Sequence, residues 1–384
     1  MPHRPDSTSP DSSRGGAQAG ASGWMIYGAT GYTGRLVAAE AVRRGLRPVL
    51  GGRNATALQA VAAEHGLATA AFPLDDPAEV RRSLAGLRLV LHCAGPFVRT
   101  SAPMVSACLD LGVHYLDITG EIAVFERILA LAGTARAAGA VLVPGVGFDV
   151  VPTDCLAATL ASALPEATHL DLAFAADRGG WSAGTIKTMI ESLPALGAVR
   201  RDGRVVPVPA FHATLDVPFA DRTRRCVTIP WGDVSTAFHT TGIPNVRTFT
   251  TVPAKAIRGL KVVGPLLPLA GLRPVKRALQ RWVERRVAGP DEATRARARA
   301  QLWGRVTAAG GAEGTVRAEV PEGYTLTAVA AVECAIRVLD GHVAPGAWTP
   351  ARAFGAGFLA TLPGTSVGEV SLDVTSSSRR SPSS

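Results

Sequence analysis

The sequence lacks the features that mark disulfide-bonded, metal-binding or membrane-spanning proteins. Its five cysteines are scattered, odd in number and form no CxxC pair, which predicts reduced core thiols. The histidines show no HxH or HxxxH spacing, so we expect no metal site. No uninterrupted apolar run reaches the ~18 to 20 residues that a membrane-spanning helix needs.

A nucleoside triphosphate motif and a secretion signal are also missing. The sequence has no GxxxxGK[ST] loop for nucleoside triphosphates. Residues 1–22 are rich in Ser, Pro and Gly and contain no apolar core of a signal peptide. We therefore expect a cytoplasmic protein with disordered tails at 1–22 and 371–384.

What is present begins with GATGYTG, which follows the apolar residues 24–27 and precedes a stretch that favours a helix. Gly28 permits a tight turn, Gly31 lets backbone amides approach a pyrophosphate, and Gly34 allows close packing of helix on sheet. The negative charge of the cofactor would lie at the helix N-terminus. This pattern predicts a dinucleotide-binding unit.

A second apolar strand, residues 48–50, leads into GGRN, where an NAD-type site would carry an acidic residue. No carboxylate occurs there, and a cation tolerates the 2′-phosphate of NADP. We therefore predict NADP(H), with Arg53 on the phosphate. The alternative is that Arg53 is a solvated loop residue and Asn54 simply caps the next helix.

Strands continue to alternate with helices up to about residue 151, which predicts right-handed βαβ units and a parallel sheet. The loops GATGYTG, GGRN, CAGPF, LDITGE and GFDVVPTD follow these strands, and should line one crevice at their carboxyl ends. The predicted cofactor-binding residues are Gly28, Ala29, Thr30, Gly31, Tyr32, Thr33, Gly34, Arg53, Asn54, Ala94, Gly95, Pro96 and Phe97.

Before residue 151 we also expect a helix at 102–111. Beyond residue 151 the pattern becomes that of an α+β domain. There we expect strands at 169–176, 225–229 and 246–252, a helix at 184–193, a helix capped by Thr325, and a last helix after residue 350. The predicted domains are a Rossmann domain at 23–155, an α+β substrate or dimerisation domain at 156–324, and C-terminal helices at 325–370. A homodimer is one candidate assembly.

One predicted strand end gathers groups that could move a proton. Tyr115, Asp117 and Glu121 are the catalytic candidates, together with Thr119, and the first two should share a face of a regular strand. Asp117 and Glu121 could equally cap the next helix. Asp149 and Asp154 carry the same two alternatives.

Residues 255–305 hold 13 Lys or Arg against three acids, whereas the whole chain has a net charge of +9. Val275, Leu279, Trp282 and Val283 recur there at helical spacing. Such a helix could rest on an anionic membrane; packing of its apolar stripe on the protein is the interpretation we favour. Nucleic acid is not an expected partner, because no recognition motif accompanies the charge.

GATGYTG, GGRN, HCAGPF, HYLDITGE, GFDVVPTD, WSAGT, YTLTA and TPARAFG together resemble the saccharopine dehydrogenase-like oxidoreductases, in the branch of the trans-acting enoyl reductases. The resemblance covers residues 24–364. It implies a Rossmann-type doubly wound α/β fold with an inserted α+β domain, C-terminal helices that return to the Rossmann domain, and a nicotinamide cofactor. It also implies a lipid or polyketide substrate made by a separate synthase.

The leading hypothesis is an NADPH-dependent reductase of a polarised double bond, preferably an enoyl C=C, in a hydrophobic metabolite. An amino-acid substrate with a C=N bond should need cationic clamps, for which the loops offer chiefly Arg99 and Arg178. A non-catalytic NADP-binding protein that docks at a membrane or synthase is the alternative from another class.

Overall fold

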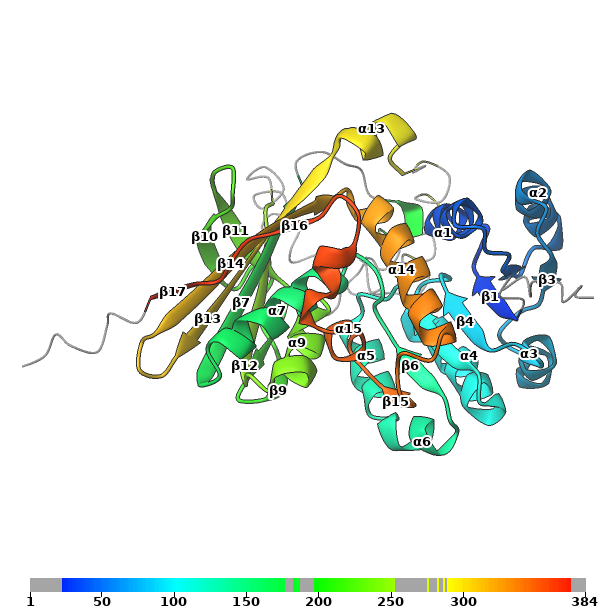
Figure 1. Cartoon of the computed structure of the whole chain (residues 1–384), viewed down its shortest axis with the longest axis horizontal. Helices are drawn as coiled ribbons and strands as arrows, with labels where there is room; N and C mark the ends of the chain where they lie inside the picture. The colour runs from blue at the N-terminus through cyan, green and yellow to red at the C-terminus, as the bar shows by residue number, and fades with distance from the viewer. Residues whose placement is uncertain are drawn as a thin grey trace, which may run out of the picture.

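The computed structural model describes residues 23–176, 197–252 and 289–373, together with residues 182–184, 186, 275, 282 and 286. These residues form two sheets that stand side by side, with helices between and around them (Figure 1). The predicted tail at 1–22, residues 374–384 and most of the predicted helix at 184–193 lie outside the described residues.

Within this described part, the first sheet is seven-stranded and parallel, with the order β15-β6-β5-β4-β1-β2-β3. Its strands are β1 (Trp24–Tyr27), β2 (Val49–Gly52), β3 (Thr69–Ala71), β4 (Leu89–His92), β5 (His114–Asp117), β6 (Val141–Val143) and β15 (Gly346–Ala347). The strand order reverses between β1 and β4, so a ligand crevice is expected at their carboxyl ends. The predicted Rossmann-type sheet is confirmed.

Helices cover both faces because alternate strand side chains point to opposite sides. Trp24 and Ile26 face α1, α2 and α14, whereas Met25 and Tyr27 face the layer of α3 to α6. The helices are α1 (Tyr32–Arg43), α2 (Ala55–His65), α3 (Pro77–Leu84), α4 (Phe97–Leu111), α5 (Ile122–Leu129), α6 (Ala132–Ala137) and α14 (Gly323–Leu339). A sheet buried on both faces explains its nearly continuous apolar strands.

The second sheet is mixed, and β12 runs parallel to β7 inside it. Its main path has the order β10-β11-β12-β7-β13-β14-β16. Its strands are β7 (Ala167–Ala176), β8 (Ala198–Arg201), β9 (Arg204–Pro207), β10 (Thr214–Pro218), β11 (Thr223–Ile229), β12 (Asn245–Thr250), β13 (Arg299–Ala308), β14 (Glu313–Pro321), β16 (Ser366–Val367) and β17 (Ser371–Asp373). Helices α7 (Val151–Ala163) and α9 (Asp233–Thr241) pack on it.

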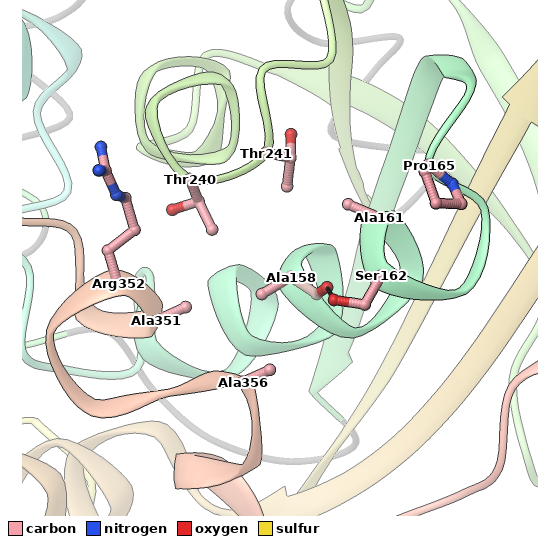
Figure 2. A pocket seen from close by; sticks show the side chains of 9 residues that line it. All are labelled: Ala158, Ala161, Ser162, Pro165, Thr240, Thr241, Ala351, Arg352 and Ala356. Atoms are coloured by element: carbon pink, nitrogen blue, oxygen red, sulfur yellow. Dashed lines mark hydrogen bonds between the residues drawn. The ribbon is translucent and has the colours of Figure 1, made fainter.

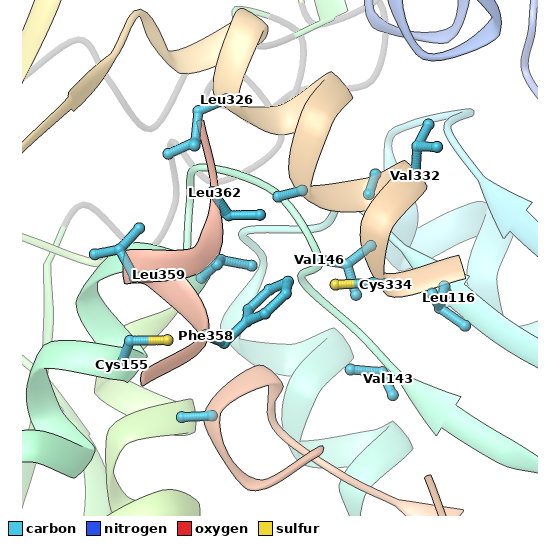
Figure 3. Close-up of a cluster of buried hydrophobic side chains, with 14 of the residues drawn as sticks. Leu116, Val143, Val146, Cys155, Leu326, Val332, Cys334, Phe358, Leu359 and Leu362 are labelled. Atoms are coloured by element: carbon cyan, nitrogen blue, oxygen red, sulfur yellow. The ribbon is translucent and has the colours of Figure 1, made fainter. Parts of the chain in front are cut away.

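The two sheets share one hydrophobic core. Phe358 of η2 (Ala356–Thr361) lies among Cys155 of α7, Val146 after β6 and Cys334 of α14, as Figure 3 shows. The C-terminal segment therefore joins both halves: α14 packs on the first sheet, to which β15 adds a strand, and β16 and β17 extend the second. The short helix α15 (Pro350–Phe354) packs on α7.

Four sequence-based expectations were wrong in detail. Helix α14 begins at Gly323 and is capped by Glu322, because that carboxylate accepts from the amides of Tyr324 and Thr325, so Thr325 is not its cap. Helix α4 begins at Phe97, five residues earlier than expected. Residues 299–305, the end of the basic segment at 255–305, form part of strand β13, where no strand was expected. Residues 371–373, expected to be disordered, pair with β14 as β17.

The predicted domain boundary after residue 155 falls inside helix α7. This helix starts at the carboxyl edge of the first sheet and runs against β13 of the second. The division into domains remains a prediction.

Candidate functional site

The glycine turn after β1 is built as the motif predicts. Gly28 has φ of +88°, and a Cβ there would lie 2.7 Å from the backbone nitrogen of Ala94. A Cβ on Gly34 would lie 2.2 Å from the carbonyl oxygen of Gly28. Both glycines are therefore required by close backbone approach, at the turn and at the first turn of α1.

The N-terminus of α1 is suited to an anion. Its cap residue is Gly31, no side chain caps it, and its first turn contains no acid. The first N–H groups of a helix lack intrahelical partners and carry partial positive charge. The residues present therefore fit the pyrophosphate of a dinucleotide.

The end of β2 separates the two residues predicted for the 2′-phosphate. Asn54 Oδ1 accepts a hydrogen bond from the amide of Ala57 at 3.0 Å, so Asn54 caps α2. Arg53 is exposed and forms no hydrogen bond or ion pair within the described part of the chain. Asn54 therefore has the capping role, and the contact of Arg53 with the 2′-phosphate stays a prediction.

At the carboxyl edge of the sheet, loops that follow neighbouring strands contact one another. Gly51 O accepts from the amide of Gly28 at 2.8 Å, and the Gly28 turn lies against Ala94. A Cβ on Gly120 would lie 2.7 Å from Asp149 Oδ2. The loops therefore lie together at the carboxyl edge of the sheet, and the crevice that they are expected to line stays a prediction.

The CAGPF loop offers mainly backbone to a ligand. Gly95 is exposed, whereas the Phe97 ring is buried against His92 at 5.5 Å between ring centroids. His92 Nε2 lies 3.0 Å from Thr100 Oγ1, and burial lowers the pKa of His92 to about 3. His92 is thus a neutral core histidine, as its apolar strand predicts.

Tyr115 and Asp117 share a face of β5 as expected, and they bond to each other. Tyr115 Oη donates to Asp117 Oδ2 at 2.7 Å, while Asp117 Oδ1 accepts from the amides of Thr119 at 3.0 Å and Gly145 at 2.9 Å. Both side chains are fully buried, and burial raises the pKa of Asp117 to about 6. The pair holds the loop after β5 to the loop after β6.

Glu121 serves the N-terminus of α4, not that of the helix which follows it. Its Oε1 accepts from the amide of Phe97 at 2.7 Å, and its Oε2 from that of Val98 at 2.7 Å. A carboxylate at a helix N-terminus satisfies unpaired N–H groups and interacts favourably with the helix dipole. The CAGPF and LDITGE loops are joined through this side chain.

Asp149 is the acid at this edge that the fold leaves available. It is partly exposed, and its carboxylate has no hydrogen bond from any residue that the structure describes. Burial raises the pKa of Asp149 from 3.8 to about 7. From the sequence, Asp149 could equally be a catalytic acid or a helix cap. The order of residues does not show that the carboxylates of Asp117 and Glu121 already accept hydrogen bonds from backbone amides.

Aromatic side chains from both sheet domains meet at Phe148, the residue that precedes Asp149. The Phe148 ring lies 5.8 Å from the Phe174 ring, which lies 4.9 Å from that of Trp231. Phe148 and Trp231 are partly exposed. The Phe148 amide donates to Thr327 Oγ1 at 3.0 Å, so α14 fixes the position of this loop.

Sequence reasoning missed the contribution of Trp231, because it lies in the second sheet domain, some 80 residues from Phe148 along the chain. The following Gly232 is packed so closely that a Cβ there would lie 2.9 Å from Val150. The turn before α9 therefore abuts the loop after β6. The adjacent tryptophan and glycine in the sequence PWGD could have pointed to this close approach.

A hollow of about 510 Å³ lies elsewhere, between α7, α9 and α15 (Figure 2). Its hydroxyls are already used: Ser162 donates to Ala158 O, and Thr241 to Ala237 O. The hollow lies at the C-terminal halves of α7 and α9, whereas the loops of the candidate site precede these helices. It therefore belongs to a different face of the second domain.

Metal sites, disulfides and membrane-spanning helices can also be checked in the described residues. Across the described residues, no cluster of His, Cys, Asp or Glu could hold a metal ion. All five cysteines are free, as expected. In the same residues, every helix is too short or too polar to cross a membrane.

The preferred interpretation of the basic helix fails at two described positions. Val275 and Trp282 are 39% and 60% exposed, so their side chains do not pack into the protein core. Leu279 and Val283 lie outside the described residues, as does Arg178.

Comparison with known proteins identifies the cofactor domain. The family model described as the saccharopine dehydrogenase NADP binding domain matches residues 24–143. A putative trans-acting enoyl reductase of Mycobacterium tuberculosis is 27% identical, and the match covers 89% of this chain and 96% of the relative. A probable mitochondrial saccharopine dehydrogenase-like oxidoreductase of Arabidopsis thaliana is 35% identical over 34% of this chain and 32% of its own length.

A solved structure supports the same fold over most of the chain. Apo saccharopine dehydrogenase (L-Glu forming) from Saccharomyces cerevisiae matches with a TM-score of 0.62 at 12% identity, covering 90% of this chain and 99% of the yeast chain. The two-sheet architecture and the glycine turn thus agree with the sequence matches. Residues 24–143 match the NADP binding domain of saccharopine dehydrogenase, most of the chain is similar to a putative trans-acting enoyl reductase, and the chain is an NADP-dependent oxidoreductase.

Proposed function

We propose that the protein uses NADPH to reduce a polarised double bond, preferably an enoyl C=C, in a hydrophobic lipid- or polyketide-like metabolite. Two observations carry this proposal: the rings of Phe148, Phe174 and Trp231 form one aromatic group, and Asp149, the residue after Phe148, has no hydrogen bond from a described residue. Apolar side chains around a few polar groups are typical of small-molecule sites. The relatives named trans-acting enoyl reductase support the same substrate class.

Bound NADPH supplies a hydride in this chemistry. Asp149 supplies the proton: its carboxyl O–H donates to the carbon next to the thioester carbonyl, and the carboxylate then regains a proton from solvent. A carboxyl whose pKa is about 7 is suited to proton transfer near neutral pH. Phe148 and Trp231 exclude water and hold the apolar part of the substrate.

Asp149 replaces Tyr115, Asp117 and Glu121 as our preferred proton donor. Tyr115 and Asp117 are fully buried and bonded to each other, and both oxygens of Glu121 accept from backbone amides. A donor must come within hydrogen-bond reach of the substrate atom. Asp149 is the candidate that meets this requirement without breaking an existing bond.

The test is an acceptor screen that follows NADPH and NADH oxidation. We expect turnover of enoyl thioesters with NADPH, and a kcat/KM that rises with chain length in the wild type. In a Phe148→Ala variant the rise should be smaller, because aromatic surface is lost; an exposed Leu111→Ala variant is the control. Turnover of imino acids alone would favour saccharopine-type chemistry, and inertness towards every acceptor would favour a non-catalytic NADP-binding protein.

We also propose a peripheral membrane contact through the basic segment at residues 255–305. Its excess of cations and the exposure of Val275 and Trp282 support this idea. Co-sedimentation with anionic vesicles, but not with neutral ones, is expected, and Trp282→Ala should weaken it. A polyketide or lipid synthase as substrate donor, and a homodimer, are further proposals that pull-down and sedimentation measurements can test.

A further inference from the structure

A single aromatic side chain of the cofactor turn is in contact with the second domain. Tyr32 is the first residue of α1 and directly follows the cap residue Gly31. Its hydroxyl donates to Pro290 O at 2.5 Å and accepts from Arg295 Nη1 at 3.0 Å. Arg295 Nη1 also donates to Pro290 O at 3.0 Å. Three groups therefore close a hydrogen-bonded triangle on the side chain of a cofactor-loop residue.

The shape of this contact depends on glycine. Gly289 has φ of +87°, and a Cβ there would lie 2.8 Å from Cε2 of the Tyr32 ring. The turn at residues 289–290 therefore rests directly on the ring. Arg295 belongs to the short helix α13 (Glu292–Arg297), and its guanidinium lies 5.9 Å from the ring centroid. The ring is thus held on one face by the segment that leads into β13.

The Tyr32 ring also contacts α14. Tyr32 and Tyr324 meet edge to face, with 4.9 Å between centroids. Tyr324 Oη in turn accepts a hydrogen bond from the amide of Ser182 at 2.6 Å. Ser182 follows β7 along the chain, and the end of β7 pairs with the start of β13 through Ala176 and Ala300. Both contacts therefore reach the same end of the second sheet.

We propose that Tyr32 is a positioning residue that couples NADPH binding to the docking of the second sheet domain. The backbone N–H of Tyr32 lies in the first turn of α1, where the pyrophosphate is expected, while its side chain holds residues 289–295. A ligand that orders this backbone also orders the side chain attached to it. The coupling is reciprocal, so docking raises cofactor affinity by the same factor. The inference rests on the cofactor assignment and not on the identity of the substrate.

The experiment combines calorimetric titration with hydrogen–deuterium exchange of the full chain, with and without NADPH. Tyr32→Phe keeps the ring and the helix but removes both hydroxyl bonds, and Arg295→Met breaks the triangle from the other side. Arg297→Met is the matched control, because Arg297 lies on the same helix, is exposed, and forms no hydrogen bond to Tyr32 among the described residues. Thermal unfolding without cofactor checks that each variant folds.

In the wild type, saturating NADPH should slow amide exchange across residues 289–297 several-fold. Tyr32→Phe and Arg295→Met should lose this protection and weaken NADPH binding by about 3- to 10-fold, the range of one or two ordinary hydrogen bonds. Arg297→Met should behave as the wild type.

Three results would overturn the proposal. The first is exchange at 289–297 that does not respond to NADPH in the wild type, although NADPH binds. The second is protection that survives in both variants, even with weaker affinity, since the effect would then be local to the cofactor. The third is a wild type that binds no NADPH; this would refute the cofactor assignment as well, and the titration alone reveals it.

Discussion

Acidic side chains in similar sequence positions have different roles, because their hydrogen-bond partners differ. Asp117, Glu121 and Asp149 all follow strands of the first sheet, but two of them are bonded to backbone amides and the third is not. A sequence shows that a carboxylate follows a strand; it does not show which amides lie opposite. The glycine turn was predictable for the converse reason, because its steric requirement is local to the turn.

The first residue-scale prediction concerns Asp149→Asn. We expect kcat to fall by about 10²- to 10⁴-fold, as for loss of a general acid, while NADPH affinity stays unchanged. Since only the protonated carboxyl donates, wild-type kcat should fall as the pH rises through about 7, and the variant should lose this limb. Stopped-flow assays across pH measure both effects.

Asp110→Asn, at an exposed position of α4, is the control. A full wild-type rate in Asp149→Asn would move the proton donor elsewhere.

The second residue-scale prediction concerns cofactor choice. Arg53→Ala should lower the ratio of NADPH to NADH affinity by about tenfold or more, because a charge-assisted bond to the 2′-phosphate is lost. Calorimetric titration with each cofactor measures the ratio. Arg82→Ala, an exposed arginine on α3, should leave it unchanged. An unaltered ratio in Arg53→Ala would show that Arg53 is a solvated loop residue.

At the scale of elements, the sequence did not reveal which helix a side chain caps or which strands pair with each other. Strand β13 is buried at most of its positions, yet its arginines count toward the basic segment at 255–305. In the fold, Asp171 of β7 bonds Arg247 at 2.7 Å and Arg305 at 2.9 Å, so neighbouring strands neutralise charges that are distant in sequence. A local charge count cannot include partners supplied by other strands.

The element-scale prediction concerns Glu121 as the external cap of α4. Glu121→Ala should lower the free energy of unfolding by about 1–2 kcal/mol, the usual range for a lost N-cap, and Glu121→Gln by less. Urea denaturation measures the change, with exposed Glu166→Ala as control. Loss of turnover in Glu121→Gln with unchanged stability would instead support a catalytic role.

At the scale of the whole molecule, buried acids set how stability depends on pH. Burial raises the pKa of Asp117 and Asp154 to about 6 and that of Asp149 to about 7, and it raises the pKa of Asp233 well above its usual value. The folded state then holds protons that the unfolded state releases above about pH 4. The pKa of Glu126 is lowered to about 2, so this residue affects the pH dependence of stability only in a more acidic range.

These raised pKa values predict how the stability of the whole molecule changes with pH. The free energy of unfolding should fall as pH rises from about 4 to 7, because the stabilising proton uptake is lost as these folded-state pKa values are passed. Asp233→Asn should flatten this slope, since a neutral amide replaces a fully buried carboxyl that is costly to ionise. Thermal unfolding between pH 5 and 8 tests it, with exposed Asp340→Asn as control. A wild-type stability that rises over this range would contradict the prediction.

The order of the chain in the first sheet has a consequence for synthesis on the ribosome. Strand β15, the edge partner of β6, comes from residues 346–347, and α14, which covers α1 and β4, from residues 323–339. The nucleotide-binding half therefore stays incomplete until residue 347 has emerged. Nascent chains that stop before about residue 340 should expose the apolar face that α14 covers and depend on chaperones, because such transient surfaces promote aggregation.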